Sequence, residues 1–173
     1  MLRGQDILIA LKIHSSGVMT YEALGRELQL SASQAHASIK RGIASSILRS
    51  DRNVRRKDLF ASLLALKYFM PGECGGMVRG VATSYATSPL NEFFSEGREP
   101  MLCWPYEKGQ HRGMALAPIY KTAPQAALAD PFLYELLALI DAIRTGRSRE
   151  VTMAEELLRE RIIERNENLT SNH

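Results

Sequence analysis

A dense run of positive charge lies between residues 40 and 57 of the sequence. It holds a single acid, Asp51, against seven basic side chains: Lys40, Arg41, Arg49, Arg52, Arg55, Arg56 and Lys57. Lysine and arginine neutralise phosphate groups, and these contacts supply essentially all of the sequence-independent affinity of proteins for duplex DNA. The run therefore predicts a surface that binds a polyanion.

Charge is more evenly balanced in the rest of the chain. Residues 1–58 carry ten Lys and Arg against five Asp and Glu, residues 59–130 carry six of each, and residues 131–173 carry six against eight. The net charge of +3 says little about partners when it is taken for the whole chain. The concentration of positive charge in residues 1–58 favours nucleic acid as the binding partner of this part of the chain.

A helix is expected where the basic run begins. Ser31 and Gln34 have the spacing of a capping box, which marks the start of a helix. Ala35, Ile39 and Ile43 then recur every four residues and form a stripe that packs against the core. The other sides of this helix carry the candidate DNA-binding residues Ser33, Gln34, His36, Ala37, Lys40 and Arg41.

These side chains are suited to different contacts with DNA. In the major groove, Gln pairs with adenine and Arg or Lys pairs with guanine, so Gln34, Lys40 and Arg41 are candidates for base recognition. Ser33 and the helix N-terminus at Ser31 are suited to hold a phosphate through hydroxyl and backbone N–H groups.

Two helices before this one are expected to support it. Residues 3–14 carry an apolar stripe of helical spacing, and Thr20 is a suitable N-cap for a second helix, Tyr21–Leu28. A further helix is expected from Asp58 to the break at Pro71.

Between the third and fourth helices, a small hairpin is expected. Residues 47–49 and 52–54 read as two short extended segments around Ser50 and Asp51. This hairpin and its end would bring four further DNA-binding candidates to the phosphates or the minor groove: Arg49, Arg52, Arg55 and Arg56.

The segment LQLSASQAHASIKRGIASSIL is similar to the turn and recognition helix of MarR- and IclR-like winged-helix regulators. The matching positions are Leu28, Leu30, Ser31, Ser33, Ala35, Ile39 and Ile47. Gly42 stands where these proteins place a large apolar residue, and Ser46 where they place glycine. The resemblance covers about residues 3–70.

This resemblance implies a winged helix-turn-helix fold that binds double-stranded DNA as a homodimer, with the recognition helix in the major groove and the basic wing on the backbone. It implies a small transcription regulator, for which repression is the expected role. It does not indicate the operator sequence.

Residues 71–130 differ in character because they contain most of the glycines and prolines. They cannot form a long helix, and residues 77–81 and 101–104 allow either short strands or packed loop. We expect an irregular, loop-rich connecting segment whose aromatic anchors are Phe93, Phe94, Trp104 and Tyr106.

The remaining residues, 131–173, are predicted to be helical. Asp130 and Pro131 begin one helix, and Gly146 ends it. Its apolar face is expected to close the core, to form a dimer interface, or to do both, and it consists of Phe132, Leu133, Leu136, Leu137, Ile140 and Ile143. Thr152 and Glu155 predict a capping box that opens a last helix reaching about Arg165.

Other kinds of chemistry find little support in the sequence. The four histidines are scattered without metal-ligand spacing, and Cys74 and Cys103 do not form a CxxC pair. We therefore expect no metal, no cofactor and no enzymatic activity. Arg79 and Arg112 are each followed by glycine, which suits either an anion site or ordinary turns.

Taken together, the sequence predicts a mainly α protein with a DNA-binding domain at 1–70, a connecting segment at 71–130 and a helical oligomerisation or effector region at 131–173. No apolar run is long enough to cross a membrane, so a cytoplasmic location is expected. The alternative is a module that binds a protein partner, such as the DNA-binding antitoxin of a toxin–antitoxin pair.

Overall fold

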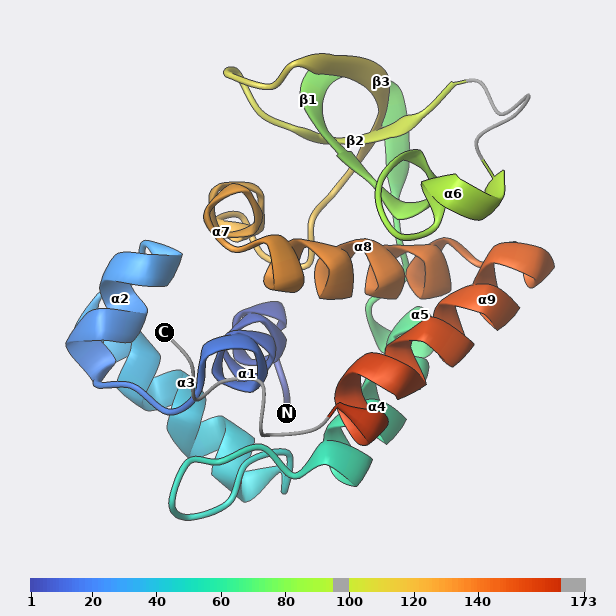
Figure 1. Ribbon diagram of the computed structural model, residues 1–173. Coiled ribbons are helices and arrows are strands. Elements are labelled where there is room, and N and C mark those ends of the chain that lie inside the picture. Colours follow the sequence, from blue (N-terminus) through green and yellow to red (C-terminus); the bar gives the residue numbers. More distant parts are fainter. Residues whose placement is uncertain (95–99, 166–173) are drawn as a thin grey trace.

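The computed structural model describes residues 1–94 and 100–165, which form mostly helices and one small sheet (Figure 1). The mainly α class is thereby confirmed. In chain order the elements are α1 (Gly4–Ser16), α2 (Tyr21–Leu28), α3 (Ala32–Ala44), α4 (Arg56–Leu64), α5 (Leu66–Phe69), β1 (Cys74–Thr83), the 3-10 turn η1 (Ser84–Ala86), α6 (Asn91–Phe94), β2 (Leu102–Pro105), β3 (His111–Leu116), α7 (Ala123–Ala129), α8 (Pro131–Thr145), α9 (Ser148–Arg159) and the π-helical turn η2 (Glu160–Glu164).

Helix α8 lies at the centre of the molecule. Figure 1 shows the sheet and α6 on one side of α8, and α1, α4 and α5 on the other. The helix begins where the Asp130 side chain accepts a hydrogen bond from the backbone N–H of Leu133 (3.0 Å). It ends at Gly146, whose φ of 80° lies in the left-handed region that favours glycine. Both ends agree with the prediction from the sequence.

The position of α8 corrects its expected role in dimerisation. Leu133, Leu136, Leu137, Ile140 and Ile143 are at most 1% exposed, because α1, α5, α7, α9 and the sheet region cover the helix from several directions. Phe132 is half-buried and packs against the same core. This apolar face therefore closes the core of a single chain, and of its six side chains only Phe132 is partly exposed.

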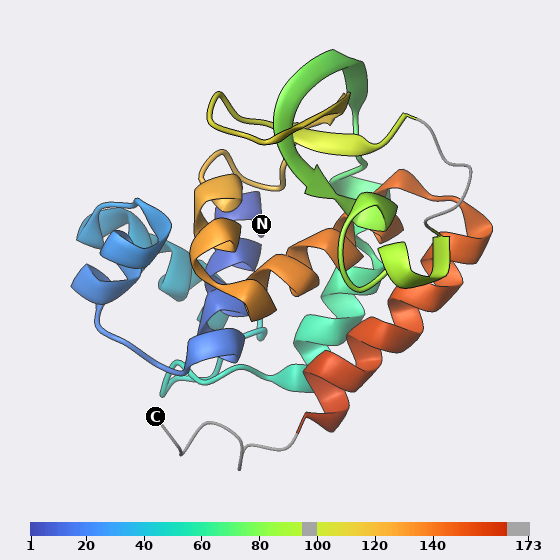
Figure 2. The same cartoon turned by 45° about the horizontal axis from the view of Figure 1, so that its top comes forward.

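The segment expected to be irregular contains the sheet. Strand β1 pairs antiparallel with both β2 and β3, while β2 and β3 run parallel, so the three strands close on one another. Figure 2 shows how strongly β1 curves as it passes between its two partners. Of the expected anchors, Trp104 and Phe94 are buried and Tyr106 packs partly against the core, but Phe93 is 53% exposed.

A buried carboxylate fixes the sheet to α8. Asp141 is 1% exposed and accepts hydrogen bonds from Thr83 Oγ1 of β1 (2.7 Å) and from Trp104 Nε1 of β2 (2.6 Å). Its other oxygen accepts from Arg144 Nη1 (2.6 Å), and Arg144 also donates to two backbone carbonyls outside the helix. Burial raises the pKa of Asp141, although its three donors act in the opposite direction.

Two helix boundaries differ from the prediction. Helix α9 begins at Ser148, one turn before Thr152, and the Thr152 hydroxyl donates to the Ser148 carbonyl (2.9 Å) rather than capping a helix. The fourth helix begins at Arg56 rather than Asp58 and divides at Ala65 into α4 and α5. In the part of the chain that the structure describes, no helix has the length and apolar character needed to cross a bilayer.

Candidate nucleic-acid interface

Helices α2 and α3 are joined by a tight turn. Thr20 caps α2 by accepting a hydrogen bond from the backbone N–H of Ala23 (3.1 Å), and Gln29 ends the helix in the left-handed conformation. A β-carbon at Gly25 would lie 2.4 Å from the Leu30 carbonyl oxygen, so the backbone of the turn passes too close to α2 for a side chain there. This geometry fixes the direction in which α3 leaves the turn.

One side of helix α3 packs against α1 and α2, and the opposite side is exposed. Ala35 and Ile39 are buried, as the four-residue spacing predicts, and α3 contacts both α1 and α2. Ser31, Ser33, Gln34, His36 and Lys40 are exposed, and Ala37 is half-buried. The stripe and the solvent side are therefore where the sequence placed them, apart from Ile43, which is only partly buried.

Gln34 has a structural role at the start of α3. Its Oε1 accepts a hydrogen bond from the backbone N–H of Ser31 (2.9 Å), while Ser31 Oγ accepts from the backbone N–H of Gln34 (3.0 Å). This is the predicted capping box. The same amide was predicted to pair with adenine, and a two-bond contact of that kind would require Gln34 to leave the cap.

Arg41 does not point freely toward solvent. Its Nε and Nη2 donate to the two carboxylate oxygens of Asp6 on α1, at 2.8–3.1 Å, and Nη2 also donates to Ser38 Oγ. The Asp6 side chain is fully buried, and the hydrogen bond with Asp6 raises the pKa of Arg41. The pair ties α3 to α1, and we therefore no longer regard Arg41 as a reader of guanine.

Arg52 is similarly engaged. Its guanidinium carbon lies 4.9 Å from the centroid of the Tyr21 ring, and its Nη1 donates to the Met19 carbonyl (3.3 Å). The Tyr21 ring in turn meets the His36 ring edge-on, with centroids 5.0 Å apart. Arg52 thus links the hairpin to the start of α2 instead of standing at an open tip.

The expected hairpin is present in reduced form. Leu48 and Val54 make an isolated antiparallel bridge, Arg49 N–H donates to Asn53 O (2.8 Å), and Arg55 N–H donates to Ile47 O (2.9 Å). We call residues 47–55 the 47–55 hairpin. At its tip, Asp51 accepts a hydrogen bond from the Asn53 backbone N–H, which lowers the pKa of Asp51.

Four of the seven basic side chains between residues 40 and 57 remain exposed, on α3, on the 47–55 hairpin and at the start of α4. They are Lys40, Arg49, Arg55 and Lys57. Arg49, Arg55 and Lys57 line a shallow hollow of about 340 Å³ together with Arg56, whose Nη1 donates to the Arg165 carbonyl (2.7 Å). The structure thus separates the predicted basic run into side chains that bind the protein itself and side chains that face solvent.

The burial of Asp6 can be predicted from the residues that follow it. Asp6 directly precedes a run of apolar residues from Ile7 to Leu11, and burial of this part of the helix also buries Asp6. A buried carboxylate needs a charged or hydrogen-bonding partner, which Arg41 provides.

Comparison of the chain with protein-family models, with curated proteins and with solved structures found no match. Within residues 1–94 and 100–165, no three His, Cys, Asp or Glu side chains form a group that could hold a metal ion.

Proposed function

We propose that residues 1–70 bind duplex DNA as a winged helix-turn-helix, with α3 in the major groove and the 47–55 hairpin against the phosphate backbone. The observation that supports this most is a capped α3 whose rear is packed on α1 and α2 and whose front is exposed. The major groove is wide enough to accept one α-helix.

Most of the affinity in this proposal comes from phosphate contacts. Lys40 on α3 and Arg49 and Arg55 on the hairpin are exposed cations that could each neutralise a phosphate. Ser33 and the backbone N–H groups at the start of α3 add hydrogen-bond donors for a further phosphate. Because Gln34 and Arg41 are engaged within the protein and Lys40 is assigned to a phosphate, base recognition falls mainly to His36.

The role that we propose for this binding is regulation of transcription. The resemblance of the segment from Leu28 to Leu48 to winged-helix regulators supports it, as does the concentration of positive charge in the first third of the chain. A homodimer is part of this proposal, and it would have to use a surface other than the apolar face of α8, which is buried.

The test is fluorescence anisotropy of the full chain with a labelled duplex of random sequence at several salt concentrations. We expect binding that weakens steeply with salt, and we expect the double variant Arg49→Ala/Arg55→Ala to lower the slope of log affinity against log salt by about 2. Lys121→Ala is the matched control, because Lys121 is an exposed cation before α7. Salt-independent or absent duplex binding by the wild type would refute the proposal.

A second candidate is binding of a protein partner. Tyr68 and Phe69 of α5 and Met77 of β1 are 79%, 46% and 50% exposed, and large apolar side chains of this kind are enriched at protein interfaces. Co-expression with the product of the neighbouring gene tests this candidate. This candidate is supported if the wild type forms a stable complex with that product and the Tyr68→Ser/Phe69→Ser variant does not.

A further inference from the structure

Two arginines face each other on neighbouring strands of the sheet. Arg79 of β1 and Arg112 of β3 are direct partners in the antiparallel register, and both are exposed. Directly opposed side chains of an antiparallel pair share one face of the sheet, where like charges destabilise the pairing. Among the described residues, neither arginine forms an ion pair. The fold therefore places two exposed arginines at opposed positions of neighbouring strands, and within the described residues neither has a counter-charge.

The glycine that follows each arginine has a separate explanation. A β-carbon at Gly80 would lie 1.8 Å from the Trp104 carbonyl oxygen, and one at Gly113 would lie 2.4 Å from the Met101 carbonyl oxygen. Both glycines permit the close approach of the strands and lie within strands rather than in turns. Strand packing thus accounts for the glycines but leaves the arginines unexplained.

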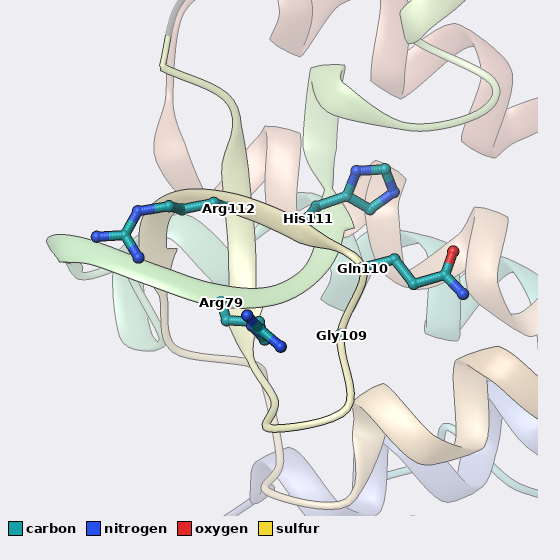
Figure 3. Close-up of a pocket in the computed structure, with 5 residues that line it drawn as sticks. All are labelled: Arg79, Gly109, Gln110, His111 and Arg112. Carbon is teal, nitrogen blue, oxygen red and sulfur yellow. The ribbon is translucent and has the colours of Figure 1, made fainter.

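The arginines belong to a hollow beside the turn between β2 and β3. The hollow has a volume of about 450 Å³ and is lined by Arg79, Gly109, Gln110, His111 and Arg112. Figure 3 shows the side chains of Arg79 and Arg112 extending from β1 and β3 in different directions, with Gln110 and His111 on the other side of the turn. This volume falls within the range of pockets for small molecules.

The chemistry of the lining selects an anion. The two guanidinium groups offer only donors, and none of the lining residues carries a carboxylate. Arginine binds phosphate through two parallel hydrogen bonds, a geometry that lysine cannot reproduce. A single phosphate would fill only part of the hollow, which leaves room for the rest of a larger ligand.

We propose that the hollow beside Arg79 and Arg112 binds the phosphoryl groups of a small phosphorylated molecule. The ligand supplies the negative charge that the lining lacks, and it does so on the sheet, which is a different part of the fold from α3 and the 47–55 hairpin. The site does not depend on DNA binding by residues 1–70.

The experiment is isothermal titration calorimetry of the full chain with sodium pyrophosphate at low, constant chloride concentration. The wild type is expected to bind, and Arg79→Gln and Arg112→Gln are each expected to weaken binding by about tenfold. Arg112→Lys keeps the charge but loses the paired hydrogen bonds, so its loss should be smaller. Lys121→Gln, which removes one positive charge elsewhere, should bind as the wild type does.

Thermal unfolding of the same variants gives a readout that folding defects cannot imitate. Without pyrophosphate, Arg79→Gln and Arg112→Gln should unfold within a few degrees of the wild type, because both positions are exposed. With pyrophosphate, only the wild type and Lys121→Gln should gain stability.

The results that overturn the proposal are distinct from a failure of DNA binding. If pyrophosphate binds the arginine variants and Lys121→Gln equally, or does not bind the wild type, the site is refuted whatever the duplex measurements show. If only duplex affinity falls in Arg79→Gln and Arg112→Gln, the arginines contact the DNA backbone and the small-molecule site is again refuted.

Discussion

The two basic surfaces of the molecule use their arginines in opposite ways. On α3 and the 47–55 hairpin, Arg41 is bound to Asp6, and Arg52 lies over the ring of Tyr21. On the sheet, Arg79 and Arg112 oppose each other across two strands and line a hollow without a carboxylate. The number of arginines in a segment therefore does not give the number available to a ligand, because a nearby buried acid or aromatic ring can bind them.

The same two regions also differ in how they are attached to the helical core. The sheet is attached through Asp141, whose partners are almost fully buried, whereas α3 is attached through an ion pair whose arginine side chain is 24% exposed. An arginine that reaches water can be solvated after its acid is lost, but a fully buried one cannot. The attachment of the sheet should therefore be the more sensitive of the two.

The largest effect is expected from Asp141→Asn. The change removes the negative charge opposite the buried Arg144 and should lower the free energy of unfolding by about 3–5 kcal/mol, measured by urea denaturation. Trp104 is the single tryptophan of the chain and donates to Asp141, so its fluorescence emission should also change in the folded state.

Glu73→Gln serves as the control for this experiment. Glu73 is exposed, and its substitution should alter the free energy of unfolding by less than about 0.5 kcal/mol. If Asp141→Asn were no more destabilising than Glu73→Gln, the attachment of the sheet would not depend on this carboxylate.

A smaller loss is expected from Asp6→Asn. It weakens the contacts with Arg41 but leaves that side chain able to reach solvent, so the free energy of unfolding should fall by about 1–3 kcal/mol. The emission of Trp104 should not change before unfolding, because Asp6 does not contact the sheet. A loss equal to that of Asp141→Asn would contradict the proposed difference between the two attachments.

The smallest effect concerns pH and the contact of α1 with η2. Burial lowers the pKa of His14, and the charges of Arg56 and Arg165 act in the same direction. The hydrogen bond between His14 Nε2 and the Arg161 carbonyl oxygen (2.7 Å) acts in the opposite direction but does not outweigh them. The unfolded chain therefore takes up this proton at a higher pH than the folded chain does. The free energy of unfolding should fall as pH decreases below the ordinary histidine value of 6.5, toward the lower pKa of the folded state.

Urea denaturation at pH 7.5 and pH 5.5 measures this difference. His14→Gln should reduce the loss of stability between the two pH values, whereas His111→Gln, at an exposed position of the sheet, should leave it unchanged. An undiminished pH dependence in His14→Gln would show that other groups cause it.

Local signals explain which elements could be predicted from the sequence. The starts of α2, α3 and α8 depend on Thr20, Ser31 with Gln34, and Asp130, each of which acts within three residues of its own position. The sheet depends instead on pairing between segments about thirty residues apart, such as Arg79 with Arg112, and no local pattern reports such pairing. The parallel pairing of β2 with β3 covers only two residue pairs, and the glycines of the strands further hide the alternation typical of strands.

The candidate site shows a second limit of sequence reasoning. The apolar face of α8 looks the same in sequence whether it packs inside one chain or between two, and only the positions of α1, α7 and the sheet decide the question. In the same way, the exposed side of α3 was predicted correctly, but the capture of Arg41 by Asp6 was not, because it joins residues from two different helices.

The close approach of the strands at Gly80 and Gly113 has a consequence for distant relatives of this chain. Any sequence that adopts the same sheet must lack a β-carbon at both positions, whatever happens to the rest of its composition. The two arginines face no such steric demand, so evolution can replace them freely unless a ligand selects for them. Relatives that keep the glycines and lose the arginines would share the sheet but not the proposed ligand. Their sequences alone would therefore show whether the ligand site is kept together with the fold.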